Sequence, residues 1–396
     1  MRERRRGWPL PSGTHMPTRV LYLHHLPLRG GAAASLLALI RHLPPEAVEA
    51  HLARPPGGPL GTPDLAQAAA LHELPTWDPR WSPSPLHLLG ELARLRAMST
   101  RIRALSTRTR PDLIHANSWQ AALAASCACG RRFPIIWHVR DLQVRPLITC
   151  RLRRAGVTCL AVSEAVRARL LDWGFPPGDI HLVPNSLDPT DFLPRRPAAA
   201  VRAELGIAPE APLVINIGQY TPWKRQDLFL EAAGLVLGEL PACRFVLVGE
   251  EVAGEEAYLG RLCSLATGPD LAEAAELFGY RDDVADLMGA CDLYAHAATE
   301  EPFGRVILEA MALAKPVVAP AAAGPGEIVG DGETGLLVEP DSAAALAEGV
   351  LRLLRAPQLA ADLGRRGRER LVECYTPQAT VEATLVVYRH LLGDAP

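Results

Sequence analysis

Two glutamates eight residues apart are the residues of this chain best suited to chemistry. Glu301 and Glu309 stand on either side of a Pro-Phe-Gly turn. On one unbroken helix, residues at that spacing lie about 12 Å apart along the axis and about 80° around it. Because the turn interrupts such a helix, we expect Glu301 in the turn and Glu309 in the second helical turn. The alternative without a functional role is that Glu301 caps the helix and Glu309 lies on the surface.

Groups that could bind an anion occur beside these carboxylates. The amides of Phe303, Gly304 and Arg305 would open the helix, where unpaired N–H groups and the helix dipole favour negative charge. Lys224, in the segment NIGQYTPWKRQDLF, follows another strand-like run, and its ammonium suits a diphosphate. A solvated loop lysine is the other interpretation, but Lys224 is one of only two lysines in the chain. Carboxylates for hydroxyls together with cations and amides for phosphate suit a nucleotide-sugar.

Length and composition indicate a globular protein of two domains. The chain has 396 residues, of which 48% are apolar and 21% charged, and this length favours two units of about 190 residues. No run of 18 apolar residues occurs that could span a membrane. Residues 1–17 are basic but lack an apolar core, so we expect a disordered leader rather than a signal peptide. Eight cysteines without metal-ligand spacing favour free thiols in the cytoplasm.

Charge is divided unevenly along the chain. Residues up to Asp188 include 24 basic and 13 acidic side chains, whereas the remainder has 17 basic and 31 acidic. A basic half suggests an anionic partner, either a membrane surface or an acidic acceptor. The helical pattern over residues 85–107 has arginines beside a leucine face. One interpretation is a helix on the sheet whose basic face is solvated. The other is a helix that contacts the inner face of an anionic membrane, where a lipid-linked acceptor would be delivered. No nucleic-acid partner is expected.

Strand-like runs alternate with helical patterns through nearly the whole chain, as in doubly wound parallel sheets. We expect an α/β protein with two Rossmann-like domains facing each other across a cleft. The expected N-terminal, acceptor-side domain covers residues 18–190, and a Pro- and Ala-rich linker covers 191–211. A nucleotide-sugar-binding domain covers 212–375, and a C-terminal helix over 376–396 packs back on the first domain.

Other candidate residues follow strands of the first domain, where open sheets of this kind bind ligands. Gly30 and Gly31 precede a helix and allow close approach of a ligand to the backbone. His138 ends the strand IIWHV, and a structural histidine is the alternative interpretation. Asn117 and Asp141 are candidates for the acceptor side.

The block E-PFGRVIL-E, followed by AMALAKPVVAP, GPGEIV and GETGLLVEP, resembles the retaining nucleotide-sugar glycosyltransferases of family 4, which have the GT-B fold. The resemblance covers nearly all of the second half and, more weakly, the first. It implies that Glu309 binds the ribose hydroxyls, that Glu301 lies by the donor sugar and that Lys224 binds phosphate. It also implies base contacts for Tyr280 and Arg281. Phe303, Gly304 and Arg305 complete the implied donor site.

For the first domain the resemblance implies that Gly30 and Gly31 form the loop between donor and acceptor. His138 corresponds to the family's histidine that contacts the donor sugar. With Lys224 and Glu301, it makes up the expected catalytic set. No metal and no cofactor are expected, since the chain has no Asp-x-Asp and the nucleotide-sugar is itself the substrate.

Two departures from the family pattern leave alternatives open. Gln219 stands where the family has a phosphate-binding arginine, so Arg225 or Arg305 would have to supply that charge. Ala323 stands at the usual first glycine of a turn that ends on Glu327. A non-catalytic nucleotide-sugar or glycan-binding protein is therefore one alternative, and a nucleotide-sugar isomerase of the same fold is another.

Overall fold

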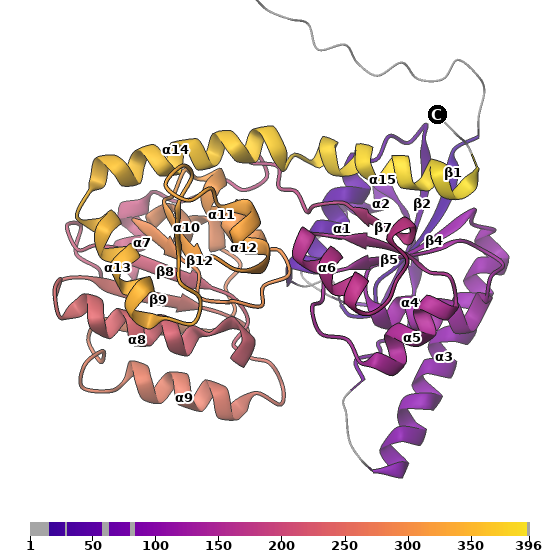
Figure 1. Ribbon diagram of the computed structural model, residues 1–396, viewed down its shortest axis with the longest axis horizontal. Coiled ribbons are helices and arrows are strands. Elements are labelled where there is room, and N and C mark those ends of the chain that lie inside the picture. Colours follow the sequence, from indigo (N-terminus) through magenta and orange to yellow (C-terminus); the bar gives the residue numbers. More distant parts are fainter. Residues whose placement is uncertain (1–15, 28–29, 58–62, 80–83, 394–396) are drawn as a thin grey trace, which may run out of the picture.

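The structure, a computed structural model, describes residues 16–27, 30–57, 63–79 and 84–393. The chain forms two lobes, each built on a parallel sheet with helices on both faces (Figure 1). The expected leader over residues 1–17 lies almost wholly outside the described residues. In the part of the chain that is described, no helix is both long and apolar enough to cross a lipid bilayer.

The first lobe has a seven-stranded sheet in the order β3-β2-β1-β4-β5-β6-β7. Its strands are β1 (Thr18–Leu23), β2 (Val48–Arg54), β3 (Ala70–Glu73), β4 (Leu113–Ala116), β5 (Ile135–Val139), β6 (Thr158–Ala161) and β7 (Ile180–Leu182). Its helices are α1 (Gly30–His42), α2 (Pro63–Ala68), α3 (Pro85–Thr109), α4 (Trp119–Cys129), α5 (Pro146–Arg154) and α6 (Glu164–Asp172), with a short 3-10 turn η1 (Pro177–Asp179). The central strands β4, β5 and β6 are buried at every position, because helices cover both faces of the sheet.

The second lobe repeats the plan with six strands in the order β10-β9-β8-β11-β12-β13. These strands are β8 (Leu213–Ile217), β9 (Arg244–Val248), β10 (Ala275–Phe278), β11 (Leu293–Ala295), β12 (Val317–Pro320) and β13 (Leu336–Val338). The helices are α8 (Gln226–Leu237), α9 (Glu256–Ala266), α10 (Val284–Ala290), α11 (Arg305–Ala312), α12 (Ala323–Ile328), α13 (Ala343–Leu354) and α14 (Pro357–Cys374), with a 3-10 turn η2 (Pro222–Lys224).

In both sheets the strand order reverses at one place, between β1 and β4 and between β8 and β11. Ligands of doubly wound sheets bind beyond the carboxyl ends of the strands at such a switch point. Residues that follow β1, β5, β6 and β7 meet the turn between β11 and α11 at what we call the lobe junction. Contacts of Arg305 with the Ser35 hydroxyl (3.5 Å) and the Ser186 carbonyl (3.1 Å) cross it.

Several elements were not expected from the sequence. The Pro- and Ala-rich segment 191–211 contains a helix, α7 (Ala198–Glu204), which packs on α10 of the second lobe. The alanines of α7 favour a helix, because alanine has the highest helix propensity. Arg202 then holds α7 against the second lobe by donating to Asp292 and to the Ala290 carbonyl. The short elements β3, α2 and α5 were also missed, because four to nine residues carry little periodic signal.

The chain returns to the first lobe at its end. Helix α14 runs along the second lobe, and α15 (Pro377–Leu392) packs against α1 of the first (yellow in Figure 1). Thr376 caps α15 and Pro377 begins it, so the two helices break at this point. Val381, Val387 and Tyr388 of α15 are buried in the core beneath α1.

Candidate active site

Lys224 and Glu301 form an ion pair on the second-lobe side of the junction. Lys224 ends the turn η2 after β8. The aliphatic part of its side chain packs on Gly218, since a Cβ at Gly218 would lie 3.5 Å from it. Its ammonium also lies 4.2 Å from the centre of the Trp223 ring. The two charged side chains are only 14% and 10% exposed, so the pair is largely shielded from water.

Burial by itself would raise the pKa of the Glu301 carboxyl, but the charge of Lys224, its hydrogen bond and that of the Phe303 amide hold that pKa below its ordinary value. Glu301 is therefore ionised at neutral pH. His296, which was not singled out from the sequence, lies with its Nε2 3.8 Å from the carboxylate and its Nδ1 2.8 Å from the Tyr294 hydroxyl. Burial lowers the pKa of His296 to about 4, so this ring is neutral.

Glu309 lies in the second turn of α11, as the turn before it predicts. Its carboxylate pairs with the Arg305 guanidinium at 3.2 Å. Burial raises the pKa of Glu309, while the positive charges of Arg305 and Lys224 oppose that rise. Lys224 thus acts electrostatically on both glutamates, and the second-lobe candidates form one charge cluster rather than separate surface groups.

Arg140, which the sequence did not single out, brings a second cation to the junction from the first lobe. It follows β5 and donates to the side-chain oxygens of Asn117 (3.0 Å) and Asn185. Burial and the nearby Arg305 lower the pKa of Arg140 to about 9, which leaves it charged at neutral pH. Two guanidinium groups from opposite lobes therefore approach each other at the junction.

His138 lies at the carboxyl end of β5 and is only 1% exposed. Its Nδ1 contacts the His115 ring at 3.2 Å and Arg140 at 3.4 Å. Burial, Arg140 and His115 together lower the pKa of His138 well below its ordinary value, so the ring is neutral. The expected contact with a donor sugar stays a prediction.

Asn117 is almost completely buried, at 1% exposure. Its amide nitrogen contacts His24 and donates to the Ala32 carbonyl, while its oxygen accepts from Arg140. These contacts give Asn117 a supporting place beneath Arg140, and its expected place on the acceptor side stays a prediction. Asp141 is half-buried, and burial raises its pKa to about 6 against the opposing charge of Arg140.

The turn before α11 is shaped by two glycines. Gly304 precedes α11 with φ at 99°, a conformation that favours glycine. Gly324 packs beneath it, because a Cβ at Gly324 would lie 2.3 Å from the Phe303 carbonyl oxygen. The Phe303 ring is buried against Tyr375, and its amide supports the Glu301 carboxylate. The expected contact of this amide with an anion stays a prediction.

On the first-lobe side, Gly30 has φ at 72° and begins α1. A Cβ on Gly31 would lie 3.7 Å from the Arg305 side chain. The glycine loop thus faces the same arginine that pairs with Glu309.

The Gln219 side chain is exposed beyond β8. Because an amide carries no charge, it does not supply the positive charge of the arginine in the family pattern. Arg225, one of the two expected substitutes, pairs with Asp341 and Asp227 and is committed to them. Arg305, the other substitute, does reach the junction.

The two residues expected at the nucleotide base follow β10. The Arg281 guanidinium pairs with Asp283 at 2.6 Å and Glu204 at 2.9 Å. This ion-pair network ties it to α7, a tertiary contact that the sequence pattern does not reveal. Tyr280 is 53% exposed. The base contacts stay predictions.

The sequence led us to expect that Glu327 ends a turn, but the structure does not place it in one. It lies in α12, and its carboxylate accepts from the amides of Glu164 and Ala165 at 2.8 Å each. These amides open α6, so Glu327 caps a helix of the opposite lobe. Ala323 has φ at 44°, which is the conformation of the glycine expected there.

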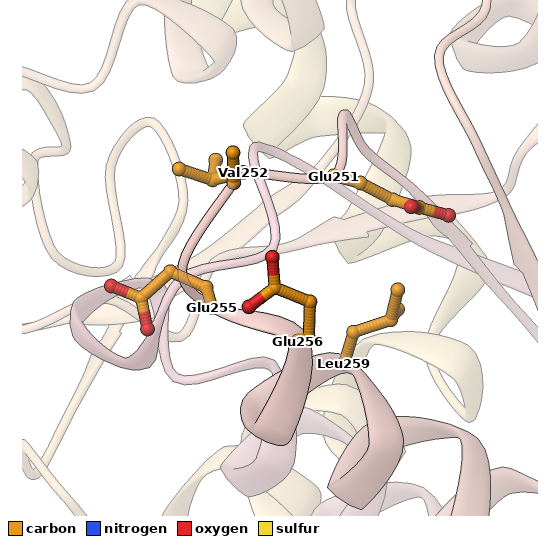
Figure 2. Close-up of a pocket in the computed structure, with 6 residues that line it drawn as sticks. Glu251, Val252, Glu255, Glu256 and Leu259 are labelled. Atoms are coloured by element: carbon orange, nitrogen blue, oxygen red, sulfur yellow. The ribbon is translucent and has the colours of Figure 1, made fainter. Parts of the chain in front are cut away.

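Two hollows among the described residues lie away from Lys224, Glu301 and Glu309. The hollow in Figure 2, of about 240 Å³, is lined by acidic residues where α9 begins. The other, of about 600 Å³, includes Gln143, which donates to Glu300 across the junction. The charge cluster itself is nearly closed. No group of three or more His, Cys, Asp or Glu side chains suited to a metal ion was found in residues 16–27, 30–57, 63–79 and 84–393.

The sequence matches two family models. Residues 29–191 match Glycosyltransferase Family 4, and residues 198–370 match Glycosyl transferases group 1. Together the two matches span both lobes and most of the chain.

Curated relatives agree with these matches. A D-inositol 3-phosphate glycosyltransferase of Kineococcus radiotolerans is 33% identical over 250 residues, which are 59% of this chain and 57% of the relative. An alpha-maltose-1-phosphate synthase of Mycolicibacterium smegmatis is 28% identical over 336 residues, 76% of this chain and 85% of the relative. The match with the first of these therefore spans little more than half of that relative's length.

Solved structures share the whole architecture. Anabaena HepE, in complex with UDP and glucose, superposes with a TM-score of 0.79 at 24% identity, over 94% of this chain and 99% of HepE. Sucrose-phosphate synthase of Thermosynechococcus elongatus gives 0.77 at 22% identity, over 96% of this chain and all of that one. These likenesses confirm the expected GT-B fold. The two family models, which together cover most of the chain, show that it belongs to the glycosyltransferases described as Glycosyltransferase Family 4 and Glycosyl transferases group 1.

Proposed function

We propose that this protein transfers a glycosyl group from a nucleoside diphosphate sugar to an acceptor hydroxyl, retaining the anomeric configuration and needing no metal ion. The observation that carries the proposal is the charge cluster at the lobe junction. Lys224, Arg305 and Arg140 supply positive charge there, and two glutamates supply hydrogen-bond acceptors for hydroxyls. Family membership and the UDP and glucose held by HepE support the same substrate class.

In this mechanism the Lys224 ammonium exchanges its bond to Glu301 for one to the donor diphosphate. The released Glu301 carboxylate then accepts from a hydroxyl of the donor sugar, and Glu309 accepts from the ribose. The glycosyl C–O bond breaks, the diphosphate leaves with its charge balanced by the cations, and the acceptor oxygen attacks from the same face. The acceptor proton passes to the departing diphosphate. Cations that meet charge developing in the transition state raise turnover directly.

Donor entry requires the lobes to move apart, since the side chains of Lys224, Glu301, Arg305 and Glu309 are 10–16% exposed. The polar contacts across the junction include Ser163 to the Pro302 carbonyl and Gln143 to Glu300. Closure after binding would exclude water and limit hydrolysis of the donor.

The test is a donor and acceptor screen that begins with UDP-glucose. We expect release of nucleoside diphosphate that depends on acceptor, a product with the anomeric configuration of the donor by NMR, and unchanged rates in EDTA. Rearrangement of the donor without any acceptor would favour an isomerase instead. Donor binding without turnover, with turnover restored by Gln219→Arg, would favour a non-catalytic binding protein.

We further propose that the beginning of α3 contacts an anionic membrane surface, because this end of the helix projects beyond the body of the first lobe (Figure 1). Four leucines on it, Leu86, Leu88, Leu89 and Leu92, are 52–80% exposed, and the exposed Arg94 follows them. Exposed leucines beside arginines suit the boundary of a bilayer containing anionic lipid.

Flotation with vesicles of anionic and of neutral lipid tests this contact. We expect binding to anionic vesicles only, weaker at high salt because charges are screened, and lost in Leu88→Ser/Leu92→Ser. Leu235→Ser, an equally exposed leucine on α8 of the other lobe, is the matched control and should float normally. Equal flotation of all variants, or none at low salt, would end the proposal.

A further inference from the structure

Two arginines from opposite lobes hold the same short segment of the first lobe. Arg140, which follows β5, donates to the side-chain oxygen of Asn185. Arg305, which begins α11, donates to the carbonyl of the next residue, Ser186, at 3.1 Å. Burial and the positive charge of Arg305 lower the pKa of Arg140, so each guanidinium lies in the field of the other. Two like charges therefore lie close together where the lobes meet.

The hydrogen-bond partners of Arg140 are neutral. Its Nε donates to Asn117 at 3.0 Å, and one terminal nitrogen lies 3.4 Å from the neutral ring of His138. The charge of Asp141 acts on Arg140 less than that of Arg305 does, and no hydrogen bond joins Asp141 to Arg140 among the described residues. A guanidinium has more N–H donors than these contacts use, so some remain for a ligand.

Among the described residues, one carboxylate contacts these two guanidinium groups. Glu309 pairs with Arg305 at 3.2 Å, and Arg140 has no such partner. The Arg305 side chain is only 16% exposed and Arg140 is partly buried, so water screens their repulsion weakly. A partly buried charge without an opposite charge is costly. An anion between the two groups would replace this repulsion with an attraction to both lobes.

The amino end of α1 lies at the same place. Asn117, which accepts from Arg140, donates to the Ala32 carbonyl in the first turn of this 13-residue helix. A Cβ on Gly31 would lie 3.7 Å from the Arg305 side chain, and Gly31 is itself exposed. The N–H groups that open a helix carry partial positive charge. They add to the attraction that the two guanidinium groups exert on an anion.

We propose that Arg140 and Arg305 form an anion site shared by the two lobes, which binds one phosphate group and thereby holds the lobes together. The planar fork of a guanidinium matches the oxygens of a phosphate. A donor diphosphate and a phosphorylated acceptor both offer such oxygens. The site itself does not rest on the proposed function, but the assignment of its phosphate to one of these substrates does.

Inorganic pyrophosphate tests the site without any sugar or nucleotide. Its effect on the unfolding midpoint of the full chain, titrated at constant ionic strength, gives its affinity. We expect Arg140→Gln to weaken that affinity at least about tenfold. Arg305→Gln should weaken it as much from the second lobe, and it keeps the proposal testable if Arg140→Gln does not fold. Arg169→Gln, at an exposed arginine of α6, changes the net charge equally and should bind like the wild type.

Affinities for UDP and uridine then identify the source of the phosphate. If it belongs to the donor, Arg140→Gln weakens binding of UDP and leaves binding of uridine unchanged. If it belongs to the acceptor, Arg140→Gln binds UDP like the wild type, and pyrophosphate still stabilises wild-type protein that is saturated with UDP.

Three results would overturn the proposal. These are equal pyrophosphate affinities in the wild type and both variants, a loss in only one of the two variants, and a wild type that pyrophosphate does not stabilise. Sugar transfer by a protein that gives any of these results would refute the shared site alone. Binding of pyrophosphate that depends on both arginines, in a protein that transfers no sugar, would refute the proposed function alone.

Discussion

Lys224 and Glu301 pair with each other although both are expected to bind the donor. Removing one partner of a buried pair leaves the other charge unpaired, which is more costly than losing the pair as a whole. A single substitution therefore mixes an effect on catalysis with an effect on stability. The two can be separated by comparing single and double variants at these positions.

Lys224→Ala is expected to lower kcat by about 10²–10³ and to change donor affinity less, because the ammonium acts mainly on charge that develops in the departing diphosphate. It should also lower the unfolding midpoint, since Glu301 loses its partner. Lys224→Ala/Glu301→Gln should recover stability without recovering turnover. Steady-state kinetics and thermal unfolding of the three proteins provide the measurement. Turnover in the double variant near that of the wild type would contradict the role of Lys224.

Glu309→Gln should weaken binding of the nucleoside diphosphate about tenfold, because a charged acceptor for the ribose hydroxyls is replaced by a neutral one. Isothermal titration with UDP measures this directly. Glu348→Gln, an exposed glutamate on α13, is the control and should bind like the wild type. Equal affinities in all three proteins would remove Glu309 from the donor site.

At the scale of secondary-structure elements, the sequence predicts most of what places these residues. Strand and helix patterns put Lys224 and Glu301 after strands β8 and β11, which border the switch point of the second sheet. The same patterns do not reveal the contacts that Arg140 and Glu327 make. Their partners lie on elements far away in the sequence, so nothing near either residue reports the contact. Helix α7 was missed because the prolines and alanines of the segment around it are typical of a linker.

Glu327 is the element-scale contact most open to testing, because it caps α6 from the opposite lobe. Glu327→Gln should weaken closure of the lobes by about 0.5–2 kcal/mol, the usual value of a helix cap. We expect a higher KM for the donor and more hydrolysis of the donor by water, with each lobe still folded. Glu373→Gln, an exposed glutamate near the end of α14, is the control. An unchanged ratio of hydrolysis to transfer would show that this cap does not control closure.

For the whole molecule, the buried histidines make stability depend on pH. Burial lowers the pKa of His24 to about 4 and those of His25 and His115 to about 3. The unfolded chain binds protons at these sites below about pH 6.5 whereas the folded protein does not, so stability is lost as pH falls. Asp141, whose pKa burial raises to about 6, binds its proton in the folded state and offsets part of the loss.

We therefore expect the free energy of unfolding to fall by roughly 1–3 kcal/mol between pH 6.5 and 5.5. Urea unfolding at constant ionic strength, followed by tryptophan fluorescence, measures the change. His115→Gln removes one titrating group and should reduce the change over this pH unit by about 1 kcal/mol. A midpoint that is constant from pH 7 to 5 would contradict the neutral, buried state of these rings.

The most direct test of the central claim is a crystal structure of the protein with a bound nucleoside diphosphate, beginning with UDP. We predict the diphosphate within hydrogen-bonding distance of Lys224 Nζ, with the bond to Glu301 broken, and the ribose hydroxyls on the Glu309 carboxylate. A nucleotide bound in the acidic hollow of Figure 2, or a complex in which Lys224 stays on Glu301 and touches no phosphate, would contradict it.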